Sequence, residues 1–245
     1  MPMETDMTTP HAPDRPLAIL FDLDGTLVDT VGIRVESWLE VFADFGIHVD
    51  RAFLAPLIGT DGKLLARIGA EHTGVTLAPG GDADIERLAG ERFAELNQHP
   101  QPLTGAAATL AHLDAVGMPW AIATSSRPDE AVASVGSLGL ARQPLVIDGS
   151  DVEHAKPAPD LLLKGAHQLA VAPVAAWYVG DSRWDMLAAV AAGMTAVGIA
   201  SGATSEADLV EAGAAMTFPD LAWFRDYFSG VVLPAAGAAR DSGVS

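Results

Sequence analysis

The stretch LAILFDLDGT, residues 17–26, joins a short apolar run to two aspartates. An apolar run without polar alternation is typical of a strand that a parallel sheet buries on both faces. If the chain stays extended, the two-residue period places Asp22 and Asp24 on one side and Leu23 on the other. Adjacent carboxylates repel each other and lose hydration, so they need a cation or a shared proton. Two interpretations stay open: a metal or catalytic site, and a solvated turn rich in Asp and Gly.

Four further strand candidates alternate with segments of helical length, at residues 119–123, 144–147, 175–179 and 195–199. This alternation predicts an α/β fold, a doubly wound parallel sheet with helices on both faces. Residues 30–103 show amphipathic helical patterns and no convincing buried strand, which predicts a helical insertion. The expected organisation is a flexible arm (1–16), a core (17–29 and 104–230), the helical insertion (30–103) and a mobile tail (231–245).

Composition limits the possible partners. The 245 residues include 14 Lys and Arg against 32 Asp and Glu, a formal charge of -18, which argues against a general nucleic-acid or anionic-membrane surface. The absence of cysteine excludes disulfides and thiolate chemistry. The polar first 16 residues lack the apolar stretch of a signal peptide, and no apolar run is long enough for an ordinary membrane span. We expect a cytoplasmic protein, monomer or homodimer, without nucleic-acid or membrane partners.

Polar residues also follow the later expected strands. Thr124 and Ser125 come directly after the second, and their hydroxyls and amides can hold an anionic oxygen. Asp181 follows the fourth, with Asp185 four residues further on at a helix start. Because ligands of open parallel sheets bind beyond the carboxyl ends of the strands, we expect these residues to share a site with Asp22.

Lys156 lies directly before Pro157, which favours an extended backbone at the lysine. A lone lysine is usually a solvated surface charge. Held at a helix entrance among acidic residues, however, its ammonium can bridge a carboxylate and a phosphate.

These residues together resemble the four motifs of the haloacid dehalogenase superfamily of hydrolases. They are DLDGT from Asp22, then Thr124, then Lys156 with Pro157, and GDSRWD from Gly180, in the order and spacing of the family. As a set the motifs are specific, although each short one alone is weak. The resemblance extends from about residue 17 to the 220s, and points to the phosphoglycolate phosphatase-like and β-phosphoglucomutase-like subgroup. It implies a Rossmann-like core with a helical cap, the segment that the patterns predict as an insertion.

The resemblance also implies a mechanism. Asp22 would attack phosphorus to form an aspartyl-phosphate, while Asp24, protonated at first, would donate a proton to the leaving alcohol and then deprotonate water. Magnesium would be held by the Asp22 side chain, the Asp24 carbonyl oxygen and Asp181, with Asp185 in support through water.

The phosphoryl group would lie in a cradle of cationic and polar groups. The resemblance implies that Thr124 and Lys156 hold its oxygens, with Ser125 and the amides near Leu23 and Asp24 completing the cradle. An Asp at position 24 is the residue of the phosphatases and phosphomutases in this superfamily, which favours phosphate esters over halides or phosphonates.

Selection of the leaving group is expected to lie with the cap. Hexose-phosphate mutases and many capped sugar phosphatases of the family have a His before a Trp; Trp38 fits this pattern, but Arg34 replaces the His, which disfavours a mutase. Arg34 and Lys63 can contact a carboxylate or second anion of the substrate, and the alternative is that both are surface charges.

The leading interpretation is a magnesium-dependent phosphomonoesterase acting on a small metabolite, phosphoglycolate-like or sugar-phosphate-like. Two alternatives stay open: a phosphomutase of the same fold, and a non-catalytic phosphate-ligand sensor, which would have no need of Asp24. Cap opening is expected about hinges near residues 28–30 and 100–103.

Overall fold

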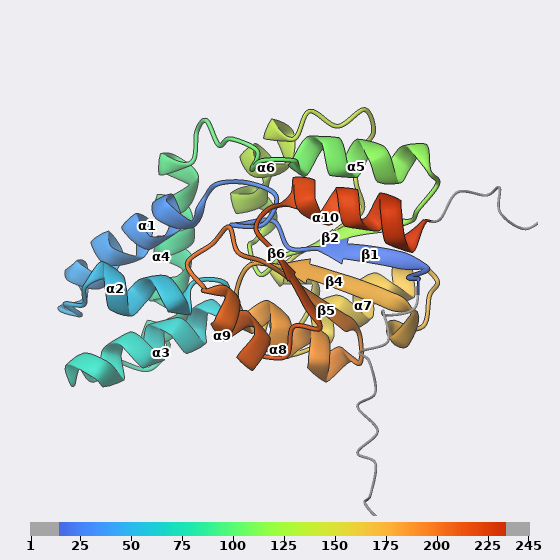
Figure 1. Ribbon diagram of the computed structural model, residues 1–245. Coiled ribbons are helices and arrows are strands. Elements are labelled where there is room, and N and C mark those ends of the chain that lie inside the picture. Colours follow the sequence, from blue (N-terminus) through green and yellow to red (C-terminus); the bar gives the residue numbers. More distant parts are fainter. Residues whose placement is uncertain (1–14, 234–245) are drawn as a thin grey trace, which may run out of the picture.

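The computed structural model describes residues 15–233, and its centre is a parallel sheet of six strands in the order β3-β2-β1-β4-β5-β6 (Figure 1). The strands are β1 (Ala18–Phe21), β2 (Trp120–Ala123), β3 (Val146–Ile147), β4 (Ala176–Gly180), β5 (Thr195–Ile199) and β6 (Met216–Phe218). All neighbouring strands in this sheet pair in parallel. The α/β doubly wound class predicted from the alternation of apolar runs is therefore confirmed.

Helices cover both faces of the sheet, as the continuous burial of its strands requires (Figure 1). Ile19 and Phe21 pack on the side of α5, α6 and α10, whereas Leu20 packs on the side of α7, α8 and α9. This alternation is the two-residue period of a strand buried on both faces. The covering helices are α5 (Ala106–Ala115), α6 (Pro128–Ser137), α7 (Asp160–Gln168), α8 (Arg183–Ala192), α9 (Glu206–Glu211) and α10 (Leu221–Tyr227). Two short 3-10 helices, η2 (Gly149–Asp151) and η3 (Pro173–Ala175), and a π-helix, η4 (Phe228–Val232), complete the sheet domain.

Between β1 and α5 the chain forms a group of helices, here called the helical insert. It comprises α1 (Val31–Asp44), α2 (Arg51–Leu54), η1 (Ala55–Leu57), α3 (Gly62–Thr73) and α4 (Gly81–Leu96). Its apolar residues, among them Phe42 and Ile85, form a core cluster of their own. The two connections to the sheet domain run side by side, because Val28 pairs with Pro102 and the Leu103 amide donates to the Leu27 carbonyl at 2.9 Å.

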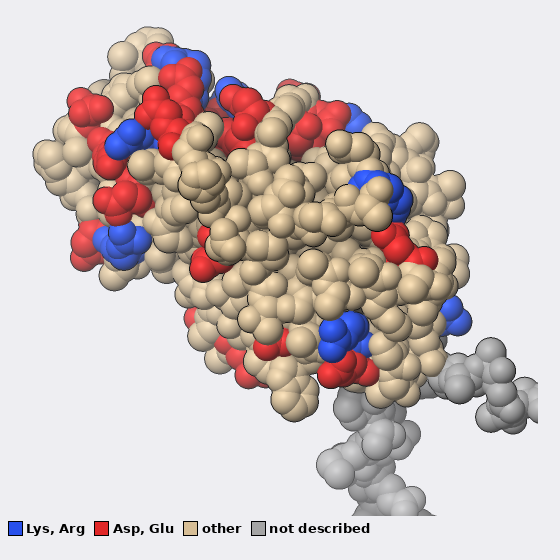
Figure 2. Space-filling model, turned by 90° about the horizontal axis from the view of Figure 1, so that it is seen from above, with Lys and Arg blue, Asp and Glu red and all other residues tan. Residues whose placement is uncertain are grey.

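Charged residues of the insert are largely arranged as exposed pairs, such as Arg51 with Glu36 and Arg87 with Glu91. Figure 2 shows the acidic and basic side chains intermixed at the insert end of the molecule, and few charges over much of the core. Isolated exposed pairs contribute little to stability. Among the described residues on this face, the basic side chains form no continuous patch of the kind that binds a polyanion.

The structure departs from the expected elements in three places. The sheet has a sixth strand, β6, which the sequence patterns miss because its three residues are only half buried. Strand β3 is two residues long, shorter than the expected 144–147. At the C-terminal end, η4 extends to the buried Val232, inside the segment expected to be mobile. The rest of that tail and most of the expected N-terminal arm lie outside the described residues.

Within residues 15–233, no helix combines the length and the apolar character needed to cross a membrane.

Candidate active site

The site begins where two neighbouring strands end. Strands β1 and β4 pair in register, Phe21 with Val179, so Asp22 and Asp181 leave the sheet close together, at the point where the strand order reverses. Both aspartates are buried. Gly25 allows the loop after β1 to pass this close: its φ is +89°, and a Cβ there would lie 2.5 Å from the Asp181 carboxylate.

Lys156 supplies the positive charge at the centre of this acidic group. Its Nζ donates hydrogen bonds to Asp22 Oδ1 at 2.5 Å, Asp185 Oδ1 at 2.8 Å and the Tyr178 hydroxyl at 3.1 Å. An ammonium has three donors, so all three are used. Burial alone lowers the pKa of Lys156, but Asp185 and Asp22 outweigh it and hold the pKa well above its usual value.

One lysine leaves the acidic group short of positive charge. Burial raises the pKa of Asp22 to about 7 despite Lys156, and burial with the neighbouring Asp185 and Asp22 raises the pKa of Asp181 well above its usual value. Oxygens of Asp22, Asp181 and Asp185 lie within 4.8 Å of one another. Hard carboxylate oxygens that lack a counter-charge suit a divalent cation such as Mg²⁺.

The three carboxylates are not equivalent. Both oxygens of Asp185 accept hydrogen bonds from protein groups. One accepts from Lys156, and the other accepts from the Ser182 amide at 2.9 Å and hydroxyl at 2.6 Å, which caps the N-terminus of α8. Asp181 accepts one hydrogen bond, from Thr26 at 2.8 Å. Asp22 and Asp181 are therefore better placed to bind a cation directly, and Asp185 is better placed to orient Lys156.

Asp24 lies on the other side of Asp22 and has different partners. It accepts hydrogen bonds from Thr30 at 2.7 Å, from Arg34 at 2.9 Å and from the Ser126 hydroxyl. Burial raises its pKa, but Arg34 and the two hydroxyls outweigh burial and leave the pKa below its usual value. The resemblance implies a protonated Asp24 for the first chemical step, whereas these surroundings favour the carboxylate.

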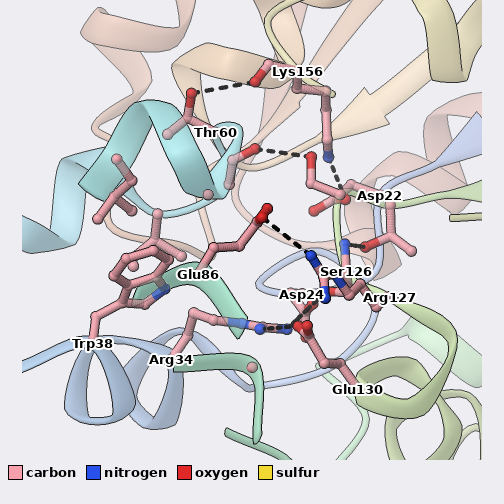
Figure 3. Close-up of a pocket in the computed structure, with 17 residues that line it drawn as sticks. Asp22, Asp24, Arg34, Trp38, Thr60, Glu86, Ser126, Arg127, Glu130 and Lys156 are labelled. Atoms are coloured by element: carbon pink, nitrogen blue, oxygen red, sulfur yellow. Dashed lines mark hydrogen bonds and ion pairs between the residues drawn. The ribbon is translucent and has the colours of Figure 1, made fainter. Parts of the chain in front are cut away.

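Arg34 links the helical insert to the core (Figure 3). From α1 its guanidinium reaches Asp24, the Ser126 hydroxyl at 2.7 Å and the Glu130 carboxylate of α6 at 2.5 Å. The guanidinium carbon lies 3.4 Å from the centre of the Phe93 ring, a cation–π contact. Arg34 is 8% exposed, so the alternative that it is a surface charge is wrong.

The remaining predicted residues occupy different parts of the site. Thr124 and Ser125 line the same cleft as Asp22 and Lys156. Leu23 has its side chain in the core, and its carbonyl accepts from the Leu27 and Val28 amides at 3.0 Å. Lys63 is exposed on the first turn of α3 and does not line the cleft.

The loop before α3 covers the site. The Asp61 amide and the Thr60 hydroxyl donate to the Lys156 carbonyl at 2.8 and 3.2 Å, which fixes this loop to the core. The cleft beneath is narrow: the volume in it that the centre of a water-sized sphere can occupy is about 60 Å³.

Sequence reasoning gave no role to several polar residues of the site. Glu86, Ser126 and Glu130 line the cleft. Thr26, which lies inside the DLDGT motif but was given no role, donates to Asp181, and the Tyr178 hydroxyl accepts from Lys156. Arg127, which contacts Glu86 at 3.1 Å, also lines the cleft. The signal available for Ser126 was its place two residues after Thr124, whereas Glu130 is typical of an ordinary acid at a helix start.

The sequence model of the haloacid dehalogenase-like hydrolase family matches residues 19–199. The chain therefore belongs to this family. Hexitol phosphatase A of Escherichia coli (strain K12) is 32% identical to it over 204 residues, covering 78% of this chain and 88% of that protein. Phosphoglycolate phosphatase of Xanthomonas campestris pv. campestris (strain 8004) is 30% identical over 184 residues, covering 74% and 82%.

A solved structure gives the same result for the fold. The crystal structure of a hydrolase from Pseudomonas syringae aligns with a TM-score of 0.82 and 29% sequence identity, covering 87% of this chain and 98% of that one. Together with the phosphatase relatives, the family match confirms the expectation of an enzyme: the chain is a phosphatase of this family.

The raised pKa of Asp22 predicts that the metal-free protein loses stability as the pH rises. Between the usual value of 3.8 and about 7, the folded state holds a proton that the unfolded chain has lost. With EDTA present, the melting temperature should therefore be several degrees higher near about pH 6 than near about pH 8. Asp22→Asn should reduce this difference in melting temperature, which would show that it arises from Asp22 and not from general repulsion among the acidic residues. Added Mg²⁺ should also reduce the difference. Stability that rises over this range would contradict the prediction.

Loss of the Arg34 charge should destabilise the protein, because it leaves the buried carboxylate of Glu130 and the partly buried carboxylate of Asp24 without their shared cation. We expect Arg34→Met to lower the free energy of unfolding by about 3 kcal/mol, measured by urea denaturation. Arg51→Met removes an exposed pair with Glu36 and should cost less than about 1 kcal/mol. Equal effects of the two substitutions would contradict this assignment.

Proposed function

We propose that the protein is a Mg²⁺-dependent phosphomonoesterase that hydrolyses a small phosphorylated metabolite through an aspartyl-phosphate on Asp22. The observation that carries the proposal is the buried group at the ends of β1 and β4, in which Lys156 bridges Asp22 and Asp185 beside Asp181. A buried nucleophile next to a fixed cation matches what attack on a dianionic phosphate requires.

In the first step, an Asp22 oxygen forms a bond to phosphorus while the bond to the ester oxygen breaks, and Asp24 gives its proton to the leaving alkoxide. In the second step, the Asp24 carboxylate removes a proton from water. The water oxygen attacks phosphorus, the bond to Asp22 breaks, and phosphate leaves. The hydroxyls and the guanidinium around Asp24 support the second role, since they stabilise the form that accepts a proton.

The phosphoryl oxygens would be held by Lys156, Thr124 and Ser125, with the amides near Leu23 completing the cradle. All three Lys156 donors have protein partners, so binding requires an incoming oxygen to replace one of them. Asp22, Asp181 and the main-chain oxygen of Asp24 would bind Mg²⁺, which neutralises charge on the phosphoryl group.

We also propose that the helical insert acts as a cap that opens about residues 28–30 and 100–103. The paired connections at Val28 and Pro102 support this, because both ends of the insert leave the core at one place. Substrate would enter in the open state, and closure would exclude water before the first step.

The class of reaction is tested with a generic aryl phosphate, assayed with and without Mg²⁺. We expect magnesium-dependent release of inorganic phosphate, and loss of activity by at least about 10³-fold in Asp22→Asn, because the amide is a poor nucleophile. Asp44→Asn, at an exposed position at the end of α1, is the matched control and should retain activity. Turnover in Asp22→Asn at the wild-type rate would exclude the proposed nucleophile.

The alternatives are less well supported. Relatives at 30–32% identity are phosphatases by name, which disfavours a non-catalytic sensor and a mutase alike. A mutase would convert a sugar phosphate into its isomer without releasing phosphate, so product analysis of the same reactions distinguishes the two activities.

A further inference from the structure

Two ion pairs lie across the cleft between the helical insert and α6 (Figure 3). Arg34 of α1 pairs with Glu130 of α6 at 2.5 Å, and Glu86 of α4 pairs with Arg127, the residue at the start of α6, at 3.1 Å. All four side chains line the cleft. The leaving group of a substrate bound at Asp22 would therefore lie among these charges.

The two cations in this part of the cleft already have anionic partners. Arg34 contacts Asp24 and the Ser126 hydroxyl in addition to Glu130, and Arg127 contacts Glu86. A carboxylate on the leaving group would have to displace one of these partners. It would gain no new counter-charge, because the displaced carboxylate would stay in the cleft.

The side chains of Glu86 and Glu130 each pack against a glycine, which has no Cβ to occupy their space. A Cβ at Gly90 would lie 3.0 Å from the Glu130 carboxyl carbon, and one at Gly62 would lie 2.6 Å from Cγ of Glu86. Burial, Asp61 and Glu130 outweigh Arg127 and Lys63, and raise the pKa of Glu86, so its surroundings already disfavour negative charge. A second anion from the substrate would add to this repulsion.

Hydroxyl groups suit this lining better. A hydroxyl donates to the free lone pairs of a carboxylate and accepts from a guanidinium group. An Arg–Glu pair can therefore form hydrogen bonds with both hydroxyls of a diol. Trp38, Ile58 and Leu65 form an apolar part of the same wall, against which the C–H groups of a polyol can pack.

We propose that the natural leaving group is an uncharged, hydroxylated one, a polyol or sugar, and that Glu86 and Glu130 select against substrates with a carboxylate there. This inference rests on the proposed phosphomonoesterase function, and it decides between the two substrate classes that the sequence leaves open.

The test compares 2-hydroxyethyl phosphate with phosphoglycolate, two esters that differ by a hydroxymethyl group in place of a carboxylate. With the Mg²⁺-loaded enzyme, kcat/KM should favour 2-hydroxyethyl phosphate by at least about tenfold. Equal rates or a preference for phosphoglycolate would overturn the proposal. Absence of turnover with both esters and with an aryl phosphate would instead refute the phosphomonoesterase function itself.

Variants of one ion pair should shift this preference in opposite directions. Glu86→Gln removes a negative charge and should reduce the preference by about fivefold or more, whereas Arg127→Gln leaves Glu86 unpaired and should increase it. Glu91→Gln, an exposed position on the same helix that pairs with Arg87, should leave it unchanged. Melting temperatures show whether each variant is folded. An unchanged preference in both folded pair variants would overturn the assignment to this pair.

Discussion

The buried contact between the Lys156 ammonium and the carboxylates of Asp22 and Asp185 is the interaction on which the site depends. Removing these charges from water is costly, and a buried ion pair repays that cost only when its hydrogen bonds are complete. Lys156 and Asp185 meet this condition, whereas Asp22 and Asp181 still have raised pKa values. The fold thus leaves negative charge uncompensated at the point where the strand order reverses, which is where open parallel sheets bind ligands.

Asp22 and Asp24 show how the surroundings shift the pKa values of two chemically identical residues in opposite directions. Asp22 has a raised pKa and Asp24 a lowered one, although only Leu23 separates them in the chain. Arg34, which the helical insert brings to Asp24, is the largest cause of the lowered pKa, and the hydroxyls of Ser126 and Thr30 add to it. The arrangement described here therefore fits the base step of hydrolysis. The acid step requires a state in which Asp24 regains a proton, and displacement of Arg34 is the direct way to favour it.

The sequence predicted those features that depend on local pattern. Apolar runs located β1, β2, β4 and β5, and the polar residues at their ends predicted that Asp22, Thr124 and Asp181 would meet. Strand β6 was missed because an edge strand of three half-buried residues has little pattern to detect. The partners of Arg34 could not be predicted, because Glu130 is 96 residues away and the contact depends on how the insert packs on α6.

The two ion pairs between the insert and α6 have opposite polarity. The insert contributes a cation in one pair and an anion in the other, while Arg127 and Glu130 lie one helical turn apart at the start of α6. If the insert docked one turn out of place, Arg34 would face Arg127 or Glu86 would face Glu130, and like charges would repel across a partly buried interface. The opposite polarity of the two pairs therefore favours one orientation of the insert on α6 over orientations shifted by one helical turn.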